Sequence, residues 1–166
     1  MTKKKPLVKP EDCEGGLYWI IVDCTQEKEL ALRYAAHRAK ANNGRVALIH
    51  IMPASTFQHW GMVQDQIKDE ERKKVEDAMC SAADLVYSLG GGLCSMHIAQ
   101  GDRVEEIVAM LNDNPASKMF ILASSEGKRP GPLVKYFTSK GIGRMRVPLV
   151  IIPQGLDESD IDYLGK

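Results

Sequence analysis

Five short apolar runs recur along the chain, and longer segments with a different spacing separate them. The runs cover residues 17–22, 45–52, 93–100, 118–123 and 147–152. Most of them are apolar at consecutive positions, which is typical of strands buried on both faces of a parallel sheet. The third run alternates and is less apolar, which indicates a strand closer to an edge of the sheet.

Between the runs, apolar residues recur every three or four positions, which is the spacing of an amphipathic helix. Helices are predicted over residues 26–43, 66–89 and 133–143, and another begins at Asp102 with an apolar stripe up to Leu111. Strict alternation of strand and helix predicts an α/β fold with one five-stranded parallel sheet and helices on both faces. A ligand of such a sheet binds beyond the carboxyl ends of the strands, where the strand order reverses.

The chain has 166 residues, which suits one domain with its own core. Residues 1–16 hold mainly lysine, proline, acidic residues and glycine, and we expect a disordered leader there. Residues 17–153 contain every predicted strand and helix and form the expected domain. Residues 154–166 are acidic, and we expect them to form a loose tail.

Charge and composition argue against several classes of function. Lys plus Arg and Asp plus Glu number 22 each, so no net charge draws the protein to nucleic acid or to an anionic membrane. No apolar run has the length of a membrane span, and no apolar signal segment follows the lysines near the N-terminus. The four cysteines form no CxxC pair, which is typical of a reducing compartment. We therefore expect a cytoplasmic protein with no nucleic-acid or membrane partner.

The first candidate for a functional side chain is Asp23, which directly follows the first apolar run in the sequence IIVDCTQ. At the carboxyl end of a strand, its carboxylate could accept hydrogen bonds from an amine or a ribose of a ligand. Aspartate is also a common N-terminal cap of a helix, and Thr25, two residues further on, favours that role as well. Both interpretations are open from position alone.

The second candidate is the loop after the fourth run, which reads SSEGKRPGP over residues 124–132. Small residues and backbone amides at a helix start can hold a phosphate, and nearby cations would strengthen that contact. The candidate phosphate contacts are Ser125, Lys128, Arg129 and Gly131. The loop matches neither the Walker A pattern nor G-x-G-x-x-G, and Glu126 would repel an anion. A plain strand-to-helix turn is the alternative.

The sequence contains no catalytic or metal-binding pattern. The four histidines lack the spacing of metal ligands, so we expect no bound metal. No Ser-His-Asp arrangement and no nucleophile elbow is present. The segment DCTQEK after the first run lacks the HIGH-type or SGGxDS-type loops of nucleotidyl transferases and ATP pyrophosphatases on related folds. An enzyme is therefore the weakest interpretation, with slow ATP hydrolysis as its upper limit.

Four segments are characteristic in combination: IIVDCT, ALIHIMP with its histidine, the QGD turn at 100–102 and the ending VPLVIIP. Through them the sequence from about Leu17 to Pro153 resembles the universal stress protein family. This resemblance implies an adenine nucleotide alpha hydrolase-like, Rossmann-like three-layer sandwich with strand order 3-2-1-4-5. It further implies a role in stress survival and a homodimer joined through the fifth strand (147–152). Many members of the family bind an adenine nucleotide, here ATP or AMP.

The resemblance also implies a set of nucleotide-binding residues. The adenine-side aspartate of the family corresponds to Asp23, and a backbone contact after the histidine of the second strand corresponds to Ile51. The end of the site that binds the base is therefore expected to be kept in this chain.

The phosphate end differs from the G-x2-G-x9-G-[ST] pattern of the nucleotide-binding branch. Aligned on ILASSEG, Ser124 stands at the first glycine and Gly127 at the second. Thirteen residues then separate Gly127 from Gly141, and Ile142 replaces the Ser or Thr.

Two functions therefore compete. The first is a dimeric stress-response module that binds an adenine nucleotide between the loops after the first and fourth strands. The alternative is a stress protein that binds no nucleotide and acts through protein contacts, with Phe57 and Trp60 as candidate contact residues.

Overall fold

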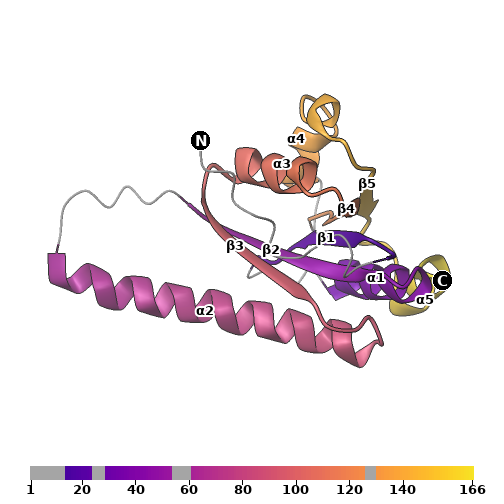
Figure 1. The fold of residues 1–166 in the computed structure, drawn as a ribbon, viewed down its shortest axis with the longest axis horizontal. Coiled ribbons are helices and arrows are strands. Elements are labelled where there is room, and N and C mark those ends of the chain that lie inside the picture. Colours follow the sequence, from indigo (N-terminus) through magenta and orange to yellow (C-terminus); the bar gives the residue numbers. More distant parts are fainter. Residues whose placement is uncertain (1–13, 24–28, 54–60, 126–129) are drawn as a thin grey trace.

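The structure is a computed structural model that describes residues 14–23, 29–53, 61–125 and 130–166. For residues 61–68 it describes the backbone alone. Strands and helices alternate as the sequence predicts (Figure 1). Their order is β1 (Leu17–Ile21), α1 (Glu29–Ala41), β2 (Arg45–Pro53), α2 (Gly61–Ser88), β3 (Ser95–Gly101), α3 (Arg103–Asp113), β4 (Ser117–Ala123), α4 (Pro132–Phe137), the 3-10 turn η3 (Ile142–Arg144), β5 (Leu149–Ile152) and α5 (Glu158–Leu164).

The five strands form one parallel sheet in the order β3-β2-β1-β4-β5. This confirms the predicted sheet and the strand order that the resemblance implies. The less apolar strand β3 lies at one edge, as its alternating pattern indicates. The chain moves outward from β1 to β3, then crosses back to β4 and moves outward again. The strand order therefore reverses between β1 and β4.

Helices cover both faces of the sheet and create two buried layers. Alternate residues of β1 point to opposite faces, so Tyr18 and Ile20 belong to one cluster while Trp19 and Ile21 belong to the other. The first cluster includes residues of α1, α2 and α5, and the second includes residues of α3 and α4. Figure 1 shows α3 and α4 on one side of the sheet and α2 on the other. The fold is therefore the three-layer sandwich that was expected.

Some boundaries differ from the prediction. Helix α2 begins at Gly61 rather than near residue 66, and α4 ends at Phe137 rather than near residue 143. The amide of Thr138 still donates to the carbonyl of Val134, but the amides of Ser139 and Gly141 both turn to the carbonyl of Tyr136. The residues after Phe137 therefore form a turn and then η3, where the sequence predicts a continued helix.

The C-terminal residues do not form the expected loose tail. Asp157 and Asp160 make a reciprocal capping box that starts α5, and the side chain of Ile161 is fully buried against the first core cluster. Arg33 of α1 donates two hydrogen bonds to the Asp162 carboxylate, at 2.5 and 3.1 Å, and His37 donates a third at 2.8 Å. The bonds from Arg33 and His37 hold the pKa of Asp162 well below its usual range. The acidic residues of this segment thus start α5 and bind it to α1.

His97 on β3 is the one histidine that the structure buries among the described residues. Its ring lies 4.8 Å from the ring of Trp19, and its Nε2 atom is buried without a hydrogen-bond partner. Burial lowers the pKa of His97, because the charged form would lose its hydration. The folded protein therefore holds His97 neutral at a pH where the unfolded chain already binds a proton.

We expect the free energy of unfolding to fall as the pH drops below about 6.5, with a contribution from His97 of up to about 1.4 kcal/mol per pH unit. The free energy of unfolding falls with falling pH because the unfolded state binds more protons than the folded state in this range. Urea unfolding at pH 7.5, 6.5 and 5.5 measures the slope. In the His97→Leu variant the free energy of unfolding should change less with pH, since the variant and the wild-type protein share all the other histidines. Equal slopes in the two proteins would contradict the assignment.

Candidate functional site

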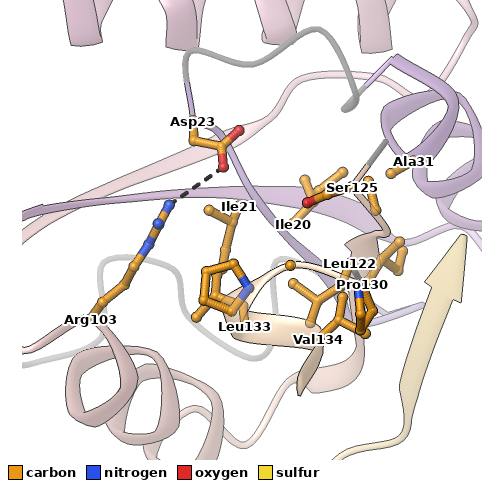
Figure 2. Close-up of a pocket in the computed structure, with 14 residues that line it drawn as sticks. Ile20, Ile21, Asp23, Ala31, Arg103, Leu122, Ser125, Pro130, Leu133 and Val134 are labelled. Carbon is orange, nitrogen blue, oxygen red and sulfur yellow. Dashed lines mark ion pairs between the residues drawn. The ribbon is translucent and has the colours of Figure 1, made fainter. Parts of the chain in front are cut away.

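A pocket lies at the carboxyl ends of β1 and β4, where the strand order reverses (Figure 2). It has an empty volume of about 550 Å³, part of which is open to solvent. Its described lining consists of Ile20, Ile21, Asp23, Ala31, Arg103, Ile121, Leu122, Ala123, Ser125, Pro130, Gly131, Pro132, Leu133 and Val134.

Asp23 is held at the mouth of this pocket by the backbone that precedes it. The amide of Val22 donates to the carbonyl of Ile49 at 2.8 Å, which extends the pairing of β1 with β2 by one residue. His50 Nδ1 donates to the carbonyl of Val22 at 2.6 Å, because a carbonyl oxygen can only accept. These two bonds fix the end of β1 and therefore the direction in which Asp23 leaves the sheet.

Arg103 faces Asp23 from the start of α3. Asp102 caps this helix by accepting from the amides of Val104 and Glu105, as the sequence predicts. The Arg103 Nη2 atom lies 3.6 Å from the Asp23 Oδ2 atom, and Figure 2 shows the guanidinium extended toward the carboxylate. The Nε atom of Arg103 is buried and has no hydrogen-bond partner in the described structure.

Arg103 is not among the site residues that the sequence predicts. Its position just after the carboxyl end of the third run could have indicated it. That run is predicted near an edge of the sheet, however, and the loop after an edge strand is not expected to reach the site. Only the crossover of α3 back toward β4 brings the start of this helix beside the end of β1.

The opposite wall is formed by the loop before α4 and by the first turn of that helix. Gly131 has a φ of 81°, which L side chains rarely adopt, and a Cβ atom there would lie 2.5 Å from the Ser125 Oγ atom. Glycine is therefore needed both for the backbone and for the close approach of the two segments. Val134 and Phe137 are buried and anchor α4 to the sheet.

The pocket brings together three of the predicted site residues, Asp23, Ser125 and Gly131. Ser124 follows β4 directly, and its amide donates to the carbonyl of Ile152, so its backbone continues the pairing with β5. Ile51 is buried within β2 and does not line the pocket. Gly127, Lys128 and Arg129 lie outside the described residues, so their predicted roles stay predictions.

Gly141 and Ile142 do not line the pocket. Gly141 packs against the ring of Tyr136, where a Cβ atom would meet a ring carbon at 2.4 Å. Ile142 is half-exposed on η3. Arg144 makes two hydrogen bonds to the Glu105 carboxylate, at 2.7 and 2.6 Å, and a third to the Tyr136 hydroxyl. These contacts hold the segment around η3 against α3.

The described residues contain neither a cluster of metal ligands nor a helix suited to a bilayer. No group of three His, Cys, Asp or Glu side chains there could hold a metal ion. None of the described helices combines the length and the apolar character that crossing a bilayer requires.

The sequence profile of the universal stress protein family matches residues 20–153. The chain belongs to the universal stress protein family. The matched segment includes the last two residues of β1, the strands β2 to β5 and the whole pocket lining. A search among curated proteins found no match.

Solved universal stress proteins have the same fold as this family member. Universal stress protein UspA from Lactobacillus plantarum is 15% identical and has a TM-score of 0.68, with 84% of this chain and 98% of that chain covered. The universal stress protein from Archaeoglobus fulgidus in complex with dAMP is 16% identical, with a TM-score of 0.62 and coverage of 82% and 97%. A universal stress protein in complex with cAMP is 12% identical, with a TM-score of 0.60 and coverage of 83% and 96%.

Proposed function

We propose that this universal stress protein binds an adenine nucleotide in the pocket between the ends of β1 and β4, as a stress-response module of the cytoplasm. The observation that carries the proposal is the pocket itself, which lies at the reversal of strand order and has Asp23 at its mouth. Family members of the same fold bind dAMP and cAMP, which supports a nucleotide as the ligand class.

The lining suits a nucleoside. Apolar side chains such as Ile21, Leu122 and Leu133 offer surfaces for the flat base or for the sugar ring. The Asp23 carboxylate can accept hydrogen bonds from an amine or from ribose hydroxyls, and the Ser125 hydroxyl can donate one. The lining thus offers a ligand both apolar surface and a small number of polar side chains.

The arrangement of glycines favours a nucleotide with few phosphates. Gly141 and Ile142, which correspond to the last glycine and the Ser or Thr of the family pattern, lie away from the pocket lining. If these two positions bind phosphates in the family pattern, a triphosphate bound in this pocket would lack those contacts. We therefore propose a monophosphate such as AMP rather than ATP.

Asp23→Ala should weaken AMP binding by about tenfold or more, because the polar groups of the ligand lose a charged acceptor in a partly buried site. Isothermal titration calorimetry with AMP, ADP and ATP measures the dissociation constants. Asp84→Ala, which removes an exposed carboxylate from α2, is the matched control and should leave them unchanged. A wild-type protein that binds none of the three nucleotides would refute the nucleotide proposal.

We also propose a homodimer joined through β5. This strand pairs with β4 on one side, and no described strand pairs with its other edge. Leu149, Val150 and Ile151 are half-buried in the single chain, so apolar surface remains for a partner. A second copy that covers this edge would bury it and would satisfy its backbone groups.

A stress protein that acts only through protein contacts is the second candidate. Exposed apolar side chains at the edge formed by β3 and the end of α2 favour it, namely Tyr87, Leu93, Met96 and Ile98. The earlier candidates Phe57 and Trp60 lie outside the described residues. A nucleotide that copurifies in stoichiometric amount would count against this function.

A further inference from the structure

We infer that a second copy of this chain docks along α2, with the two α2 helices antiparallel. Two features carry the inference: the first half of α2 projects beyond the sheet (Figure 1), and its exposed middle turns have a charge pattern that is complementary to itself. The contact is separate from the one proposed for β5, because α2 leads into β3, and β3 and β5 are opposite edges of the sheet. It also requires no bound nucleotide.

Helix α2 is longer than the part of the sheet that it covers. Its 28 residues span about 42 Å, whereas the seven residues of β3 span about 23 Å. The buried side chains described in α2 all lie in its second half, namely Val75, Met79, Ala82 and Val86. From Asp69 to Lys74 every side chain is exposed. This stretch therefore lies outside the core of a single chain.

An uncovered part of the sheet lies beside α2. Met96 of β3 pairs in register with Leu48 of β2, which belongs to the first core cluster. Met96 and Ile98, two residues further along β3, therefore point to the face that α2 covers. They are nevertheless 42% and 43% exposed. Helix α1 packs on the inner side of α2, over β1 and β2, so these two side chains lie on the outer side, toward the edge of the sheet. A helix that runs along the outer side of α2 would cover them.

The charges of α2 match those of a second α2. Three acidic residues, Asp69 to Glu71, precede three basic residues, Arg72 to Lys74. When two copies are related by a two-fold axis between residues 71 and 72, the acidic turn of each copy lies beside the basic turn of the other. A parallel arrangement in register would instead place like charges side by side. Such complementarity selects the partner and the register of the two helices.

The same two-fold axis places the projecting half of each helix over the uncovered face of the other chain. Residues 61–68 of one copy then lie beside residues 75–82 of its partner, which is the segment that packs on the sheet. On the outer side of that segment are Met96 and Ile98. Each copy thereby covers apolar surface of the other, and the burial of this surface supplies affinity while the ion pairs set the register.

Charge reversal in these two turns tests the contact, by sedimentation velocity over a dilution series at low ionic strength. Asp69→Lys/Glu70→Lys and Lys73→Glu/Lys74→Glu should each weaken self-association by at least about tenfold, because like charges then face each other. An equimolar mixture of the two variants should associate to within about threefold of wild type, since the basic turns of one variant then face the acidic turns of the other. All four changes in one chain should likewise restore self-association.

Two further variants separate the contact from general effects of charge. Asp84→Lys/Asp113→Lys makes the same change in net charge as the first reversal, at exposed positions outside the paired segment, and should behave as wild type. Met96→Ser/Ile98→Ser changes no charge and should weaken self-association by at least about tenfold, because the apolar surface that the partner covers is lost. Circular dichroism of each variant establishes that it is folded. If a reversal loosens α2, Met96→Ser/Ile98→Ser decides the test, because it leaves α2 unchanged.

Two results overturn the inference and leave the proposed nucleotide site and the β5 contact standing. One is a wild-type protein whose self-association neither charge reversal changes. The other is a pair of reversal variants that do not associate with each other when they are mixed. A wild-type protein that is monomeric at every concentration overturns this contact and the β5 contact together.

Discussion

Phe137→Ala is expected to lower the free energy of unfolding by about 3–5 kcal/mol. The side chain of Phe137 is fully buried in the second core cluster. Its ring meets the rings of Phe120 and Tyr136 edge to face, at centroid distances of 5.4 and 5.3 Å. Alanine removes both contacts and leaves a cavity that the rigid sheet beneath it fills poorly. Urea unfolding at 25 °C measures the change.

Phe137→Leu is the matched control, because it keeps most of the apolar volume and should cost about 1–1.5 kcal/mol. The alanine variant should also bind the nucleotide more weakly while it is still folded. The reason is that α4 carries Leu133 and Val134 into the pocket and is a short helix anchored mainly by Val134 and Phe137. A loss of less than about 1 kcal/mol in the alanine variant would show that Phe137 does not anchor this helix.

Ile161→Ala is expected to lower the free energy of unfolding by about 2–4 kcal/mol. Ile161 is fully buried and is the one buried side chain of α5, which packs on α1. A seven-residue helix has little stability of its own, so its position depends on this contact and on the ion pairs that Arg33 makes. Thermal and urea unfolding followed by circular dichroism report the loss.

Tyr163→Ala provides the comparison for Ile161, since the Tyr163 side chain is 80% exposed on the same helix. It should change the free energy of unfolding by no more than about 0.5 kcal/mol. Equal effects of the two variants, both within that limit, would mean that α5 is not docked in solution. That outcome would restore the interpretation of this segment as a loose tail.

The sheet could be predicted from the sequence because each strand carries its own signal. A run such as LYWII in β1 is buried on both faces, and such a run has few alternatives to the interior of a parallel sheet. Asp23 could be found for the same reason, because the end of a buried strand is recognisable and ligands of these sheets bind there. The boundary of α4 was less accessible, since the helix ends where the amides of Ser139 and Gly141 both donate to the carbonyl of Tyr136, and no side-chain pattern indicates those backbone bonds.

The sequence by itself determined the strands, their parallel arrangement and three residues of the pocket, Asp23, Ser125 and Gly131. These follow from local patterns, namely buried runs and the loops that directly follow them. Only the tertiary structure decided that Arg103 faces Asp23 and that Ile161 docks an acidic segment on α1. Both are contacts between side chains that lie far apart in the sequence. A single charged residue such as Arg103, or a single apolar one such as Ile161, forms no periodic pattern from which its partner could be predicted. Their pairing depends on how the crossover helices cover the sheet, which is settled only when the whole core is packed.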